Sequence, residues 1–107
     1  MNEISVKILK QKLDNKEAIH ILDVREPNEY AASNLGGTLI PIGELPHRLE
    51  ELDKNKVFAV LCHSGVRSAY ATTLLEKAGF SSVFNIKGGI VAWTLEKETQ
   101  AMALSAD

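Results

Sequence analysis

Short apolar runs alternate with amphipathic segments along this chain. A run that is apolar throughout is typical of a strand covered on both faces, whereas apolar residues three or four positions apart are typical of a helix. Together with turn signals, the first pattern predicts strands over residues 19–24, 38–40, 57–61 and 82–86. The second predicts helices over residues 5–15, 27–32, 44–52, 66–78 and 90–97.

Individual residues mark several ends of these helices. Ser5 is a typical N-cap, Pro27 suits the first position of a helix, and Gly79 suits a helix C-terminus. Tyr70 and Trp93 lie among apolar neighbours in predicted helices. We therefore expect both aromatic side chains to pack in the core.

The alternation of strands and helices predicts an α/β fold with a central parallel sheet flanked by helices. Ligands of such folds collect beyond the carboxyl ends of the strands. Residues 23–25, 62–67 and 87–89 all follow predicted strands, so we expect them to converge on one edge. Residues 1–107 form one predicted domain with a core over about 5–97, and the small, polar tail 98–107 is expected to fray without a partner.

Composition and charge exclude several classes of function. The net charge of −2 gives no basic surface for nucleic acid or an anionic membrane, and neither is expected as a partner. A single cysteine cannot form an internal disulfide, and His20, His47 and His63 lack metal-ligand spacing, so we expect neither metal nor cofactor. No apolar stretch approaches the roughly 20 residues of a membrane span, and the N-terminus lacks the apolar core of a signal peptide. If the sequence is the full natural chain, these features predict a cytoplasmic protein.

The single cysteine, Cys62, lies between the strongest predicted strand and a predicted helix, with Gly65 and Arg67 in between. The N–H groups of a tight turn and of a helix N-terminus form an anion site, which lowers a cysteine pKa from about 8.5 to roughly 3.5–7.5. Gly65 allows a positive φ, and Arg67 has a planar set of donors suited to an oxyanion. The alternative is a buried cysteine that acts only as a small apolar residue. The combination of strand, turn, arginine and helix favours a nucleophilic thiolate.

The loop CHSGVRS at 62–68 resembles the active-site loop of rhodanese-like sulfurtransferases. Three further motifs resemble that family in the expected order: LDVREPNEY at 22–30, IPIGEL at 40–45 and GGIVAW at 88–93. Together they cover nearly the whole domain. The resemblance implies the rhodanese-like three-layer fold, with the parallel sheet flanked by helices on both faces.

One segment departs from the family pattern. Many members carry GHIPGA before the second motif, whereas residues 33–38 read SNLGGT, shorter by one residue and without the histidine. No role of that histidine can be transferred to this chain. The variant over residues 34–46 looks more like the rhodanese domains fused to enzymes that activate ubiquitin-like sulfur carriers, which bears on the partner rather than on the chemistry.

The resemblance implies sulfur transfer through a persulfide on Cys62, with a donor such as thiosulfate or a persulfide protein. A sulfur-carrier protein, thioredoxin or cyanide would then be the acceptor. Residues of the loop are assigned to substrate binding: His63, Ser64, Gly65, Val66, Arg67 and Ser68.

Several of these residues admit a second interpretation. His63 reinforces the anion site or is a solvent-facing loop residue, and Ser68 donates to the site or only occupies the helix end. Asp23 and Arg25 are predicted to support the cleft by orienting Arg67 or the loop. Alternatively, Arg25 pairs with a neighbouring glutamate at the surface.

Two other functions remain alternatives. Cysteine phosphatases also pair a thiolate with an arginine, but those that resemble this fold have a loop one residue longer than the spacing from Cys62 to Arg67. A non-catalytic docking module is the second alternative, although such rhodanese-like domains lack the cysteine. The sequence leaves the physiological donor, the acceptor and the oligomeric state undetermined.

Overall fold

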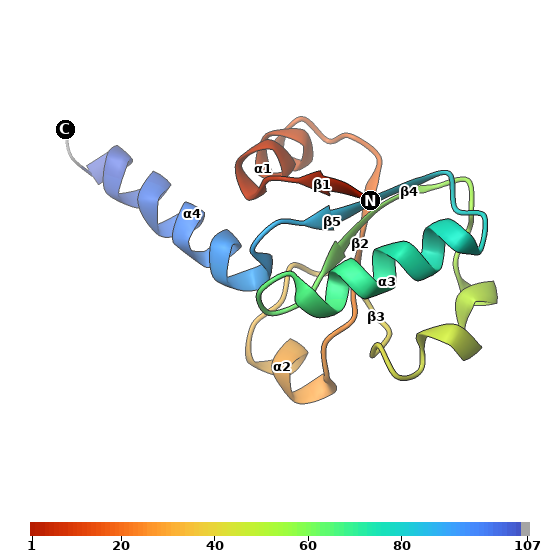
Figure 1. The fold of residues 1–107 in the computed structure, drawn as a ribbon. Helices are drawn as coiled ribbons and strands as arrows, with labels where there is room; N and C mark the ends of the chain where they lie inside the picture. The colour runs from red at the N-terminus through yellow and green to blue at the C-terminus, as the bar shows by residue number, and fades with distance from the viewer. Residues whose placement is uncertain (106–107) are drawn as a thin grey trace.

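The structure is a computed structural model that describes residues 1–105. Its centre is a five-stranded sheet in the order β1-β5-β4-β2-β3, in which every neighbouring pair is parallel. The strands are β1 (Asn2–Ile4), β2 (Ile19–Asp23), β3 (Thr38–Leu39), β4 (Val57–Leu61) and β5 (Ser82–Ile86). The helices are α1 (Val6–Asp14), α2 (Pro27–Ala32), η1 (Leu45–His47), η2 (Leu49–Glu51), α3 (Val66–Lys77) and α4 (Gly89–Ser105), where η denotes a 3-10 turn. Figure 1 shows this sheet between its helical layers.

Alternating side chains of the central strands build two separate cores. On β4, Phe58 and Val60 face the side covered by α3, and their cluster includes Leu75. Ala59 and Leu61 face the other side, in a cluster with Leu9 of α1 and Ile90 of α4. Both faces of β4 are therefore covered, which explains its continuous apolar sequence. The predicted three-layer α/β fold is confirmed.

Most predicted elements are confirmed, including the Ser5 cap, whose Oγ accepts a hydrogen bond from the Ile8 N–H at 3.2 Å. The single helix predicted over 44–52 is wrong, because this segment forms the two turns η1 and η2. Arg48, between them, has φ −126° and interrupts the helical backbone. Tyr70 was also misjudged: its side chain is 63% exposed, whereas the partly buried Trp93 packs against the core.

The last helix is longer than expected. Helix α4 continues to Ser105 instead of ending near residue 97, because residues 90–105 contain no glycine or proline and many strong helix formers. In Figure 1 its distal part extends away from the rest of the domain. The short strand β1, which the sequence analysis did not predict, extends the sheet beside β5.

No helix within the described residues is both long enough and apolar enough to cross a membrane.

Candidate functional site

Cys62 lies directly after β4, at the carboxyl edge of the sheet. The chain then turns through Gly65, whose φ of +103° is the left-handed conformation that glycine adopts without strain. A Cβ at this position would lie 3.3 Å from the Gly88 nitrogen. The turn ends at the start of α3, so the strand, the turn and the helix are arranged around the sulfur as predicted.

The Cys62 sulfur is enclosed by hydrogen-bonding groups. The Gly65 N–H donates to Sγ at 3.0 Å, and the Ser68 hydroxyl lies 3.1 Å away. The cysteine is only 1% exposed, and burial by itself raises the pKa of the thiol. The Ser68 hydroxyl and the N–H groups of Ser68, Gly65 and Ser64 outweigh burial, so the pKa of Cys62 is lowered. Favourable contacts with the sulfur anion are the cause.

A buried polar chain extends from the sulfur into the sheet. Ser68 donates a short hydrogen bond to Oδ1 of Asn85, whose Nδ2 donates to the Gly65 carbonyl at 3.2 Å. Both side chains are buried, so the chain links α3, β5 and the turn without contact with solvent. Ser68 is thus more than a helix-end residue. The sequence analysis missed Asn85, although an amide in an apolar strand, on the same face as Val83, was a usable signal.

Arg67 forms a bidentate ion pair with Glu29. Its Nη1 and Nη2 atoms donate to the two carboxylate oxygens of Glu29, on α2, both at 2.8 Å. Arg67, together with the Glu26 N–H, lowers the pKa of Glu29 to about 2. The guanidinium that was expected to hold an oxyanion therefore already has a carboxylate partner, which the sequence analysis did not anticipate.

Asp23 and Arg25 form a second ion pair. Arg25 Nε and Nη2 donate to the two oxygens of Asp23 at 2.9 and 2.8 Å, and Arg25 is only 3% exposed. The alternative of a surface pair with a glutamate side chain is therefore wrong. Arg25 also donates to the carbonyls of Glu29 and Ser33, at 3.4 and 2.7 Å. These bonds fix α2 against the end of β2, and thereby position the residue that binds Arg67.

The segment after β5 supports the cysteine loop from the other side. The N–H groups of Ile90 and Val91 donate to the carbonyls of Cys62 and His63 at 2.9 and 3.2 Å. A Cβ at Gly89 would lie 2.4 Å from the His63 oxygen, so only glycine fits this approach. The Val24 N–H also donates to the Leu61 carbonyl at 3.0 Å, so residues 23–25, 62–67 and 87–89 converge on one edge as predicted.

The remaining loop residues lie toward solvent. Ser64 and Val66 are exposed, and Val66 reaches 76%. His63 is exposed as well and lines a shallow, mainly apolar groove of about 470 Å³ with Arg25, Glu29, Ile90, Val91 and Leu95. The groove borders the loop that carries Cys62.

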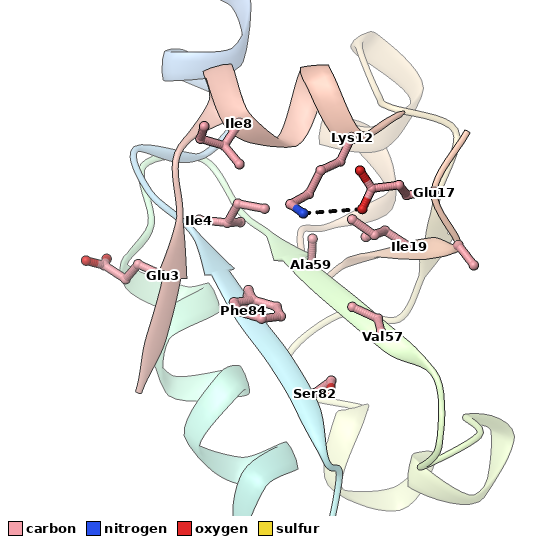
Figure 2. A pocket seen from close by; sticks show the side chains of 11 residues that line it. Glu3, Ile4, Ile8, Lys12, Glu17, Ile19, Val57, Ala59, Ser82 and Phe84 are labelled. Carbon is pink, nitrogen blue, oxygen red and sulfur yellow. Dashed lines mark hydrogen bonds and ion pairs between the residues drawn. The ribbon is translucent and has the colours of Figure 1, made fainter. Parts of the chain in front are cut away.

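A larger cavity lies over the starts of β2, β4 and β5. Figure 2 shows it between α1 and the strands, lined by apolar side chains that include Ile4, Ile19 and Phe84, with the Lys12–Glu17 ion pair at 3.2 Å beside them. Its volume is about 650 Å³. Because Val57 lines it at the start of β4, whereas Cys62 follows the end of that strand, the cavity is separate from the cysteine loop.

Within residues 1–105, no three or more His, Cys, Asp or Glu side chains are grouped so as to hold a metal ion.

Comparison with known proteins assigns the fold and the loop to a family. The profile of the rhodanese-like domain matches residues 5–96. YtwF of Bacillus subtilis, named as a candidate sulfurtransferase, is 38% identical over 94% of this chain and 95% of its own length. YrkF of the same organism, named as a candidate sulfur carrier protein, is 42% identical over 90% of this chain, which spans about half (52%) of that relative. A crystal structure of a rhodanese-like domain protein from Staphylococcus aureus superposes on this structure with a TM-score of 0.81 and 35% sequence identity. The superposition covers 87% of this chain and 91% of the Staphylococcus aureus chain. The chain belongs to the rhodanese-like domain family.

Proposed function

We propose that this protein is a sulfurtransferase that carries sulfane sulfur as a persulfide on Cys62. The observation that carries the proposal is the set of donors around Sγ, with the Gly65 N–H at 3.0 Å and the Ser68 hydroxyl at 3.1 Å. Such donors stabilise an anion that is fixed in place before the reaction. The names of the relatives described above, a sulfurtransferase and a sulfur carrier, support the same general activity.

The reaction consists of two displacements at sulfur. The Cys62 thiolate attacks the outer sulfur of a donor such as thiosulfate, so that an S–S bond forms to Sγ while the donor S–S bond breaks. The electron pair of the broken bond leaves with sulfite. An acceptor thiolate or cyanide then attacks the outer sulfur, and the electron pair of that bond returns to Sγ. The covalent intermediate divides one difficult transfer into two easier steps.

The loop supports both steps through the donors around Sγ. Because these donors lower the pKa of Cys62, they increase the fraction of the nucleophile that is ionised before the donor molecule arrives. Gly65 and Ser68 are proposed to stabilise the returning thiolate as well.

The test is the intact mass of the protein after exposure to thiosulfate. We expect the mass to increase by one sulfur atom, the increase to disappear after cyanide is added, and no increase in Cys62→Ser. Hydrolysis of an aryl phosphate by the same preparation, without any sulfur adduct, would instead identify a phosphatase. The absence of an adduct with every donor, and of phosphate hydrolysis, would favour the docking module.

A further inference from the structure

We propose that Glu29 is a specificity-determining residue of the sulfur-transfer site. By pairing with Arg67 it cancels the positive charge at the mouth of the cysteine loop, so that the site prefers organic sulfane-sulfur donors of low negative charge to dianionic thiosulfate. The inference rests on the proposed function, because it concerns the donor that reacts with Cys62.

In the Arg67–Glu29 ion pair, Glu29 occupies the edge of the guanidinium that an anionic donor would need for binding. Arg67 Nη1 and Nη2 each lie 2.8 Å from one oxygen of Glu29, which is the bidentate geometry with which arginine binds carboxylate or phosphate groups. The side chains of Arg67 and Glu29 are only 34% and 27% exposed. An anionic donor would have to displace a carboxylate that is already in place.

Glu29 is also held in position by groups other than Arg67. Its Oε1 accepts a hydrogen bond from the Glu26 N–H at 2.9 Å, in the capping box at the start of α2. Its carbonyl accepts from the buried Arg25, which also donates to the Ser33 carbonyl. Rotation of the carboxylate away from Arg67 therefore breaks a cap, and movement of the whole helix breaks the Arg25 contacts.

The other basic side chains near the loop do not replace Arg67. Arg25 is buried and paired with both oxygens of Asp23. His63 and Lys87 are exposed, and solvent and salt weaken the electrostatic interactions of exposed side chains. The charges of the two ion pairs, Asp23–Arg25 and Glu29–Arg67, therefore cancel, and the carboxylate of Glu26 adds further negative charge near Arg67.

This charge balance matters because the first step joins two anions. A thiolate that attacks thiosulfate brings one negative charge against two, and the encounter is repulsive unless a cation compensates. An organic donor with one negative charge or none meets less repulsion. Its organic part can also contact the apolar side chains around the loop, where Val66, Val91 and Leu95 are 76%, 43% and 58% exposed.

Two sulfur donors of nearly equal size allow the effect of donor charge to be measured separately from the effect of donor shape. Thiosulfate and the methanethiosulfonate anion both transfer an outer sulfur to a thiolate, and they differ by a methyl group in place of one charged oxygen. In each case the S–S bond of the donor breaks, and sulfite or methanesulfinate leaves with the electron pair. The measured quantity is kcat/KM for sulfur transfer to cyanide with each donor, and the ratio of the two values.

For Glu29→Gln we expect the ratio of thiosulfate to methanethiosulfonate to rise about five- to ten-fold, because Arg67 is then free to bind the second negative charge. Glu29→Asp retains the charge and should keep the wild-type ratio. Glu50→Gln, which removes the same charge from an exposed position in η2, should keep it as well.

The wild-type protein gives a second readout that depends on no substitution. We expect its kcat/KM for thiosulfate to increase as salt rises from about 0.02 to 0.5 M, since screening weakens repulsion between like charges. A free Arg67 guanidinium would offset the charge of the thiolate, and the rate would then not increase with salt.

A thiosulfate rate that falls with salt, or an unchanged ratio in a folded Glu29→Gln protein, would overturn the role of Glu29 while leaving the persulfide mechanism intact. Failure of both donors to load Cys62 would overturn the proposed function and this inference together.

Discussion

The Ser68 hydroxyl lies 3.1 Å from the reacting sulfur, and its proton has two possible acceptors, Sγ of Cys62 and Oδ1 of Asn85. When Cys62 is a thiol, the Ser68 hydroxyl can donate to Asn85 while Sγ–H donates to Ser68. When Cys62 is ionised, the Ser68 hydroxyl can turn toward Sγ and stabilise the anion. The Ser68 hydroxyl can therefore form a hydrogen bond with the sulfur whether Cys62 is neutral or ionised.

Replacing Ser68 by alanine should raise the pKa of Cys62, because burial remains while a hydrogen bond to the anion is lost. The pH profile of the alkylation rate by iodoacetamide should move to higher pH. Near pH 7 the rate should fall roughly ten-fold, since a hydrogen bond to a charged group contributes about 1.5–3 kcal/mol. Ser64→Ala is the matched control, because that side chain is exposed and should leave the profile nearly unchanged. An identical profile for both variants would contradict the role given to the hydroxyl.

At the scale of elements, the start of α3 depends on a backbone that only glycine adopts easily. Gly65→Ala places a Cβ at φ +103° and 3.3 Å from the Gly88 nitrogen. We expect this change to lower the free energy of unfolding by about 1–3 kcal/mol, measured by urea denaturation. Gly43→Ala meets no atom within 4 Å and should change stability by about 0.5 kcal/mol or less. Equal stability of the two variants would show that the turn relaxes freely.

Features within one element or one loop could be predicted from the sequence, whereas contacts between distant elements could not. The cysteine loop was predictable because its signals are local: a strand, a glycine, an arginine and a helix within a few residues. The partner of Arg67 was not, because Glu29 is 38 positions away and meets it only when α2 docks beside α3. The leucine spacing over 44–52 matched a helix, but a run of leucines does not reveal that the backbone breaks at Arg48.

At the scale of the whole molecule, two ion pairs lie together at a junction of three elements. Two separate apolar clusters cover the two faces, whereas the ion pairs Asp23–Arg25 and Glu29–Arg67 lie where β2, α2 and α3 meet. These pairs connect α2, which buries no residue of its own, to the rest of the fold. The short helix is thus held mainly by polar contacts, and its attachment should respond to pH.

The pKa of Glu29 gives the direction of that response. Its folded-state pKa of about 2 lies below the ordinary value of 4.5, so the pair stabilises the fold fully above the ordinary value. The contribution is lost as the pH falls from about 5 through 2, when the carboxylate of the folded protein takes up a proton. Because both side chains are partly exposed to solvent, we expect this contribution to the free energy of unfolding to be about 1 kcal/mol rather than the full value of the shift.

Urea denaturation at several pH values should show that wild type is more stable than Glu29→Gln near neutrality. The stabilities of the two proteins should converge near pH 2, and Glu50→Gln should follow wild type throughout. Parallel curves for wild type and Glu29→Gln would mean that the carboxylate contributes the same free energy whether charged or not, and would remove the electrostatic role assigned to this pair.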